Sequence, residues 1–198
     1  MISKVVAKEV LNEALATGAD YAEIFYEDSI HTTISVENGK VKTLSSNSVC
    51  GAAIRLLKEN QTVYGYTNNL TKKGLMDLAL SLRASFHSER LITIEDFEQV
   101  KAPNRNPVKN SYNDISKEEI ISLIKEGTKA IEELNEPRIV RYTGNFLTHH
   151  RFVCLYNSKQ KWFKRDTEFG RLAYTVIAAN EKGYEMGFNG PGAQQDIS

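Results

Sequence analysis

The hydrophobic pattern of this 198-residue chain switches twice from the period of a helix to the period of a strand. Apolar residues first recur every three or four positions over residues 4–16, and they then alternate with polar residues over 19–67. The same change follows a second helical pattern over residues 116–134. The pattern therefore predicts an α+β fold of two consecutive helix-plus-antiparallel-sheet blocks.

The first block covers residues 1–86 and has the order helix, antiparallel meander, helix. Ser3 is suited to cap the first helix and Gly18 to end it. The pair Asn38-Gly39 tolerates the positive φ angles of a two-residue turn, so we expect a hairpin there. The expected strands are residues 19–27, 32–37, 40–45, 49–58 and 61–67, and the closing helix is 71–86.

A connecting segment over residues 87–115 separates the two blocks, because it contains two prolines among polar residues. The second block, residues 116–198, opens at Ser116 with a capping box that Glu119 completes. Its helix is expected to bury an apolar stripe formed by Ile120, Leu123, Ile124, Ala130, Ile131 and Leu134. The strands expected after it are residues 138–147, 151–157, 160–167, 170–179 and 184–189. The sequence shows no fixed-period repeat, although both blocks combine a helix with a sheet.

The charge balance limits the classes of partner. Lysine plus arginine and aspartate plus glutamate both number 25, so the formal net charge is zero. Proteins that bind nucleic acid usually carry a basic excess, and no nucleic-acid partner is expected. No apolar run approaches the roughly 20 residues that cross a bilayer, and the N-terminus lacks the apolar core of a signal peptide. The sequence therefore predicts a cytoplasmic protein without a membrane partner.

Residues that could perform catalysis are few and unfavourably spaced. Helical zinc sites need two histidines three or four residues apart, whereas His149 and His150 are adjacent and should point to opposite faces of a strand. His150 and Cys154 can share a strand face, but about 13 Å of strand separates them, which is too far for proton transfer. Cys50 and Cys154 are expected to be buried, inert thiols. The sequence predicts neither a catalytic nor a metal-binding residue in this chain.

Aromatic residues are the group that suggests a contact surface. Tyr64 and Tyr66 lie two positions apart in a predicted strand, so they share one face. Core packing would explain such residues, and so would contact with a peptide or a partner protein. We take Tyr64 and Tyr66 as the peptide- or partner-contacting hypothesis. A second aromatic group, Phe152, Tyr156, Trp162 and Phe163, is expected in the second sheet.

Four stretches of the first block form a series: residues 19–27 (ADYAEIFYE), 37–42 (ENGKVK), 50–56 (CGAAIRL) and 64–71 (YGYTNNLT). In order and spacing they resemble the N-terminal region of the TldD/PmbA family, often labelled modulator of DNA gyrase. The likeness is strong to about residue 86 and looser over the second block. The Tyr-Gly-Tyr sequence resembles the TldD branch more than the PmbA branch.

The resemblance implies a soluble zinc metallopeptidase that degrades or matures unfolded peptides, as a homodimer or as paired TldD/PmbA-type subunits. The family's metal-binding H-E-x-x-x-H helix lies in a following C-terminal domain, and this motif is absent from the 198 residues. No catalytic residue can therefore be carried over, and no cofactor is expected in this chain. Zinc is expected in the missing C-terminal domain. The loop chemistry of the closing stretch GPGAQQDIS favours a natural chain that continues.

Two hypotheses of function follow. In the first, the chain is the non-catalytic N-terminal part of a TldD-type zinc metallopeptidase, and it shapes the substrate chamber and the subunit contacts. In the alternative, it is a stand-alone protein-interaction module of the same fold without catalytic activity. An H-E-x-x-x-H motif further along the reading frame would favour the first hypothesis, and a stop codon would favour the second.

Overall fold

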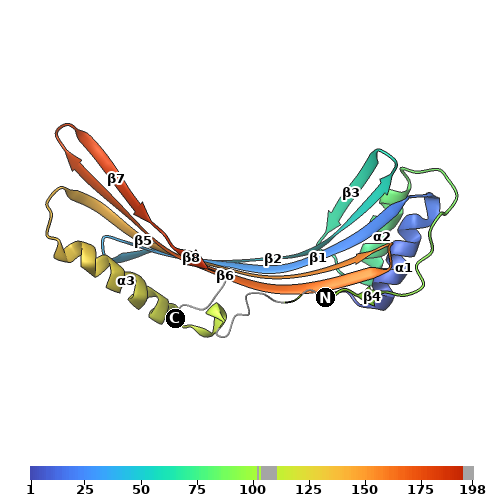
Figure 1. Cartoon of the computed structure of the whole chain (residues 1–198), viewed down its shortest axis with the longest axis horizontal. Coiled ribbons are helices and arrows are strands. Elements are labelled where there is room, and N and C mark those ends of the chain that lie inside the picture. The colour runs from blue at the N-terminus through green and yellow to red at the C-terminus, as the bar shows by residue number, and fades with distance from the viewer. Residues whose placement is uncertain (102, 104–110, 194–198) are drawn as a thin grey trace. The chain divides into compact units, whose positions relative to one another are not determined.

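The computed structural model describes residues 1–101, 103 and 111–193. Its helices and long strands are labelled in Figure 1. The helices of the described residues are α1 (Lys4–Ala14), α2 (Lys72–Arg83) and α3 (Lys117–Glu133), with 3₁₀ turns at Leu15–Thr17 and Tyr112–Asp114. The strands of the same residues are β1 (Tyr21–Glu37), β2 (Lys40–Lys58), β3 (Gln61–Thr67), β4 (Glu98–Gln99), β5 (Ile139–Asn157), β6 (Lys161–Asn180), β7 (Gly183–Asn189) and β8 (Gly192–Ala193).

Over the described residues the strands form one hydrogen-bonded sheet of eight strands. Its order is β3-β2-β1-β5-β6-β4, and β7 and β8 also pair with β6. β3 is antiparallel to β2, and β7 and β8 are antiparallel to β6, whereas the two-residue strand β4 lies parallel to β6. The α+β class predicted from the sequence is confirmed.

Two compact units share this chain and alternate along it. The first contains the described residues of 1–29, 49–103 and 151–166, and the second contains the other described residues. The strands β1, β2, β5 and β6 each contribute residues to both units. The units therefore differ from the predicted boundaries at residues 86 and 116, because contacts between neighbouring strands group segments that are far apart in the sequence.

The four long strands continue through positions where the sequence pattern predicts breaks. Interruptions are predicted at residues 28–31, 46–48, 148–150 and 168–169, and these predictions are wrong. The stretches are rich in polar residues, so the alternation of apolar side chains is lost there. The backbone of a polar residue can still form the inter-strand hydrogen bonds. All four stretches lie close to positions where the chain passes from one unit to the other.

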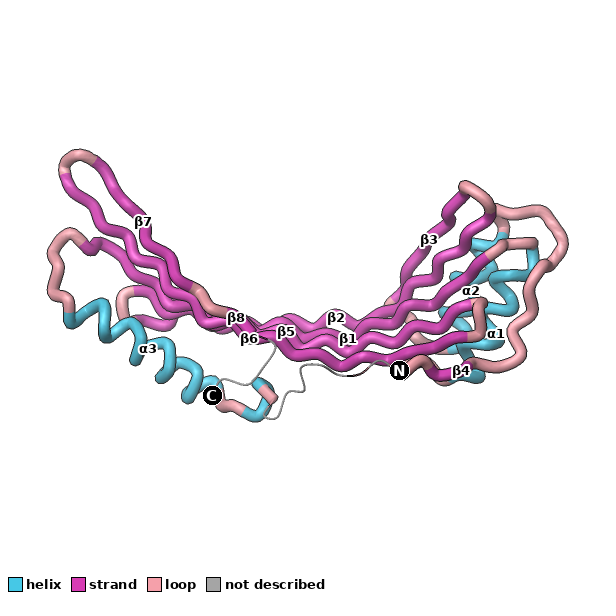
Figure 2. The backbone as a smooth tube through the Cα atoms, in the orientation of Figure 1, coloured by secondary structure: helices cyan, strands magenta, loops and turns pink. Residues whose placement is uncertain are grey.

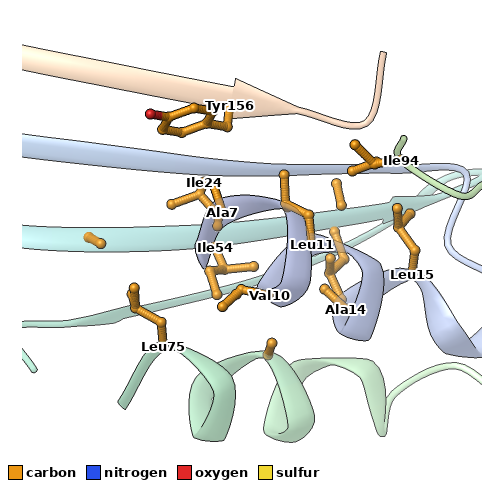
Figure 3. Close-up of a cluster of buried hydrophobic side chains, with 14 of the residues drawn as sticks. Ala7, Val10, Leu11, Ala14, Leu15, Ile24, Ile54, Leu75, Ile94 and Tyr156 are labelled. Carbon is orange, nitrogen blue, oxygen red and sulfur yellow. The ribbon is translucent and has the colours of Figure 1, made fainter. Parts of the chain in front are cut away.

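In the first unit, α1 and α2 pack against each other and cover one face of the sheet. The backbone N–H of Val6 donates to the hydroxyl of Ser3, which confirms the predicted cap. Figure 3 shows how side chains of both helices meet those of the strands. Fully buried residues of this core include Ala7, Val10, Leu11, Ala14, Leu15, Ile24, Ile54 and Leu75. Burial of one large aliphatic side chain contributes about 1.5–3 kcal/mol, so this cluster is the main source of stability of the unit.

In the second unit, α3 lies along the strands, as Figure 2 shows. The predicted capping box is confirmed, because the Glu119 N–H donates to the Ser116 hydroxyl and the Ser116 N–H donates to the Glu119 carboxylate at 2.9 Å. The buried residues of this smaller core are Ile34, Val36, Tyr112, Ile120, Ile124 and Phe146. A Cβ on Gly144 would lie 2.4 Å from Cγ2 of Ile124, so the helix approaches the sheet closely at this glycine.

The apolar stripe predicted for α3 is only half correct. Ile120 and Ile124 are buried, but Leu123, Ala130 and Leu134 are exposed. The helix turns Ile120 and Ile124 toward the sheet, and no other element among the described residues covers the flank that carries the exposed three.

The aromatic cluster predicted for the second sheet lies in the first unit instead. Tyr156 and Trp162 stack with ring centroids 5.7 Å apart, and the Tyr156 hydroxyl donates to the carbonyl oxygen of Ile2 at 3.0 Å. Lys4 of α1 places its ammonium 5.1 Å from the Trp162 ring. The prediction fails because the ends of β5 and β6 that meet belong to the first unit.

The predicted hairpin turn at Asn38-Gly39 is confirmed. Asn38 has a φ of 46° and Gly39 a φ of 73°, which are the positive angles of a type I′ turn. The turn is held to β5 by two hydrogen bonds of 3.0 Å. In these, the Asn38 N–H donates to the carbonyl oxygen of Tyr142, and the Tyr142 N–H donates to Oδ1 of Asn38.

We predict that Ser116→Ala lowers the free energy of unfolding by about 1 kcal/mol, because the hydroxyl that caps α3 is lost. Urea denaturation at neutral pH would measure this. Ser122→Ala is the matched control, since the Ser122 hydroxyl donates only to a carbonyl of its own helix and alanine favours a helix interior. Equal losses in the two variants would contradict the capping role.

The difference between wild type and Ser116→Ala should also depend on pH. Hydrogen bonds from Ser116 lower the pKa of Glu119 from 4.5. A lowered carboxylate pKa stabilises the folded state above the unfolded value, and that contribution is lost as the pH falls. The difference should therefore shrink below pH 4.5. Denaturation curves at several acidic pH values would test this, and a difference that grows toward acid would contradict it.

Candidate interaction surface

The sheet of the first unit has a second face, opposite to α1 and α2. Along β3, Gly65 faces α2, where a Cβ would lie 2.8 Å from Leu78. Tyr64 and Tyr66 alternate with it, so they point the other way and are 60% and 81% exposed. The two tyrosines predicted as contact residues thus lie together on a solvent-facing surface.

The register between β2 and β3 gives the tyrosines their neighbours. Arg55 lies opposite Tyr64, and Ala53 lies opposite Tyr66. A hollow of about 250 Å³ opens beside them and is lined by Glu23, Phe25, Ala53, Arg55 and Tyr64. Four neighbouring strands, β1, β2, β3 and β5, contribute to this surface. We call it the open face, and it comprises Tyr21, Glu23, Phe25, Glu27, Ala53, Arg55, Tyr64, Tyr66 and Arg151.

Glu23 is the central charged residue of the open face. Its carboxylate accepts hydrogen bonds from the Arg55 guanidinium at 2.7 Å and from the Tyr21 hydroxyl at 2.6 Å. Burial of the phenol, followed by the hydrogen bond to Glu23, raises the pKa of Tyr21 to about 12. Tyr21 therefore remains a neutral donor at physiological pH and fixes the orientation of the carboxylate that pairs with Arg55.

A second ion pair borders the same face. Arg151 of β5 donates to the Glu27 carboxylate at 2.8 Å, and its guanidinium carbon lies 5.9 Å from the centre of the Phe25 ring. The hydrogen bond to Glu27 raises the pKa of Arg151, so the residue stays cationic. Half-exposed pairs of this kind contribute about 0–1 kcal/mol to stability. Their larger effect is that they present charges of both signs around an aromatic ring.

The outer edge of β3 extends the open face with backbone groups. β3 stands at one end of the strand order, so its outer N–H and C=O groups have no neighbouring strand among the described residues. Such an edge can pair with an added extended segment, while alternate side chains of that segment contact the adjoining surface. The open face therefore combines exposed aromatic rings, two ion pairs and a free strand edge.

Two of the histidines lie together in the second unit. The rings of His149 and His31 stack with centroids 3.8 Å apart. Across residues 1–101, 103 and 111–193, no three His, Cys, Asp or Glu side chains gather as they would around a metal ion. Within the same residues, no helix combines the length and apolar character needed to span a membrane.

The two cysteines differ in their environments. Cys154 is buried as predicted, and burial raises the pKa of its thiol, which keeps it protonated. Cys50 is exposed, contrary to the prediction, and its sulfur lies 3.6 Å from the Tyr26 hydroxyl. The reason is that the buried part of β2 begins only at Ala52.

Most residues of the open face were not identified as functional from the sequence. The alternation along β1 places Glu23 and Phe25 on one face, which is a usable signal. The positions of Arg55 and Arg151 beside them depend on strand register and on the order β2-β1-β5. Neither follows from the hydrophobic pattern.

A second group of exposed apolar residues lies on β7 in the second unit. Tyr184, Met186 and Phe188 alternate along the strand and are 75%, 65% and 59% exposed. The guanidinium of Arg171 on β6 lies 5.2 Å from the Phe188 ring. The sequence predicted this strand but not the exposure of its apolar residues.

Comparison with known proteins bears on the first block. Residues 22–85 match the sequence profile of the PmbA/TldA metallopeptidase domain 1. No match was found among curated proteins.

Solved structures share the fold over nearly the whole chain at 15% identity. A protein from Bacteroides thetaiotaomicron, described as a modulator of DNA gyrase, gives a TM-score of 0.76 with 98% of this chain and 46% of its own covered. A Thermotoga maritima protein with a similar description gives 0.69, with 88% and 40% covered. TldE from Thermococcus kodakarensis gives 0.61, with 95% and 43% covered. The chain thus spans less than half the length of each of these proteins. The match of residues 22–85 to the first domain of the PmbA/TldD family confirms the resemblance to that family's N-terminal region.

Proposed function

We propose that this chain is the non-catalytic N-terminal part of a TldD-type zinc metallopeptidase that degrades or matures unfolded peptides. The observation that carries the proposal is the match of residues 22–85 to the first domain of that family. The structural neighbours are more than twice as long as this chain, which leaves room for a separate catalytic domain.

In this proposal the open face forms part of the surface that surrounds the substrate. An unfolded peptide exposes its backbone and a mixture of side chains, so a suitable surface must tolerate many sequences. Tyr64 and Tyr66 offer large apolar areas at a low cost in side-chain entropy. The Glu23–Arg55 and Glu27–Arg151 pairs offer partners for charges of either sign.

In this proposal the zinc ion belongs to the C-terminal domain. A catalytic zinc site needs three protein ligands and an open position. The described residues of this chain do not bring three such ligands together, and the family motif that would supply them is absent from the sequence. We propose that this chain holds the peptide and forms subunit contacts, in a homodimer or with a paired TldD/PmbA-type subunit.

The description "modulator of DNA gyrase" belongs to two of the neighbours, and we do not extend it to DNA binding by this chain. The formal net charge of zero supplies no excess of cations for phosphates. We propose cytoplasmic residence, which the free thiols of Cys50 and Cys154 support.

We predict that this chain binds an unstructured peptide and that Tyr64→Ala/Tyr66→Ala weakens this binding about tenfold, because two exposed aromatic contacts are removed. Fluorescence anisotropy of a labelled, unstructured peptide of mixed charge would measure the dissociation constant. Circular dichroism would verify that the variant is folded.

The matched control is Tyr184→Ala, which removes a similarly exposed tyrosine from β7 in the second unit. Its dissociation constant should stay within about twofold of the wild-type value, because surface substitutions away from a contact have small effects. An unchanged affinity in the Tyr64/Tyr66 variant, or an equal loss in both variants, would exclude the open face as the peptide-binding surface.

We also expect the chain by itself to retain no stoichiometric zinc and to cleave no peptide. The test is metal analysis after incubation with zinc and repurification, followed by incubation with an unfolded peptide with and without zinc. One equivalent of retained zinc, or metal-dependent cleavage that survives repurification, would show that the chain is itself a peptidase.

The reading frame after Ser198 distinguishes the two hypotheses, the enzyme part and the stand-alone interaction module. A downstream segment with an H-E-x-x-x-H helix would support the enzyme part. A stop codon directly after Ser198, together with retained peptide binding, would support the module instead.

A further inference from the structure

The two halves of the chain repeat one order of elements. α1, β1, β2 and β3 are a helix, two long strands and a seven-residue strand, and α3, β5, β6 and β7 are the same. The terminal hairpins also correspond in register. Ile54 pairs with Gly65 in the first, and Val176 pairs with Gly187 in the second, 122 positions later in both strands. The β6–β7 hairpin can therefore be compared residue by residue with the β2–β3 hairpin.

In the first unit, α2 covers the helix-facing side of its hairpin. A Cβ on Gly65 would lie 2.8 Å from Leu78 and 3.3 Å from Leu82, so the helix rests directly on the strand at this glycine. Ile54 and Leu56, which follow the same face along β2, are fully buried. This face of the hairpin is therefore an apolar surface that the amphipathic helix α2 covers.

Among the described residues of the second unit, no helix covers the corresponding face. Tyr174 identifies it, because its hydroxyl contacts backbone carbonyls of α3, and alternation places Val176 and Ala178 on the same side. Val176 and Ala178 are only half-buried, whereas their counterparts in β2 are fully buried. A Cβ on Gly187 would meet no atom within 4 Å.

The uncovered face continues onto neighbouring elements. Leu134 of α3 is 68% exposed and Val140 of β5 is 55% exposed. A hollow of about 490 Å³ lies at the hairpin end, where Ala178, Gly183 and Glu185 are among its lining residues. Among its described residues, the second unit thus has a surface and a free space that correspond to those beneath α2 in the first unit. No helix among those residues covers them.

We infer that this face of β6–β7 binds an amphipathic helix presented by a partner polypeptide, in the way that α2 covers β2–β3. Three features define the ligand. Leucines spaced three and four residues apart match the stripe of Leu75, Leu78 and Leu82. The open space over Gly187 admits large aliphatic side chains above the strand. A basic residue suits Glu185, which stands where β3 carries Val63.

The inference does not depend on peptidase activity, because it rests on the internal correspondence of the two hairpins. It also differs from binding of an extended peptide at the open face, which lies in the first unit. A helical ligand with a leucine stripe should therefore act on the second unit, whereas an unstructured peptide should be sensitive to Tyr64 and Tyr66.

The probe is a synthetic, fluorescently labelled peptide of residues 70–86, which contains the α2 sequence with two lysines and one arginine. We expect it to bind the full chain, and its binding should slow amide hydrogen exchange in residues 174–189. A peptide with Leu75, Leu78 and Leu82 each replaced by serine is the matched ligand control, and it should bind at least about tenfold more weakly.

Two variants of adjacent β7 residues test the face. Gly187→Glu places a charged side chain on the proposed helix-binding face and should weaken binding about tenfold. Met186→Glu places the same side chain on the opposite face of the strand and should change the dissociation constant less than about twofold. Circular dichroism and thermal melting would confirm that both variants remain folded.

Several outcomes would overturn the inference. They are no binding of the α2 peptide, equal binding of the serine-substituted peptide, and equal losses in Gly187→Glu and Met186→Glu. Protection from hydrogen exchange in residues 52–67 instead of 174–189 would also overturn it, because the probe would then be replacing α2 in the first unit. Self-association of the chain that Gly187→Glu abolishes, without peptide binding, would identify a second copy as the occupant.

Discussion

The backbone hydrogen bonds along β1, β2, β5 and β6 are the constraint on which the other features of this protein depend. These strands have 17 to 20 residues each and continue through polar stretches where apolar packing is lost. Extended polar backbone is stable there because neighbouring strands satisfy its donors and acceptors. Continuous strands also carry late parts of the sequence into the first unit, where Tyr156 of β5 packs against residues near the N-terminus.

Helix cover on one side of the sheet determines which side chains the other side can expose. In the first unit, α1 and α2 bury one face and supply its stability, so the opposite face can carry exposed side chains. Tyr64 and Tyr66 are exposed there next to ion pairs that contribute little to stability. Burial raises the pKa of the Tyr21 hydroxyl, so Tyr21 remains a neutral hydrogen-bond donor to Glu23. This surface is the one that we propose to hold an unfolded peptide.

The repeated order of elements shows that two corresponding hairpins can differ in whether a helix covers them. Gly65 is packed under leucines of α2, and Gly187 faces open space. Between residues 52–67 and 174–189 the sequence keeps only Glu59 with Glu181 and Gly65 with Gly187. This is too little for a repeat to be recognised from residue identity. The correspondence is visible because strand register is retained when side chains diverge.

The sequence by itself determined the elements whose causes are local. The caps at Ser3 and Ser116, the positive φ angles at Asn38-Gly39 and the amphipathic helices follow from neighbouring residues, and the structure has them. Tertiary structure alone decided which strands are continuous, which segments share a unit and which side chains surround Tyr64. Those outcomes depend on pairing between residues far apart in the chain, and hydrophobic periodicity reports whether a residue is buried but not which strand it will adjoin. For the same reason, the sequence predicted burial of Leu123 and Leu134, and only the arrangement of elements around α3 left them exposed.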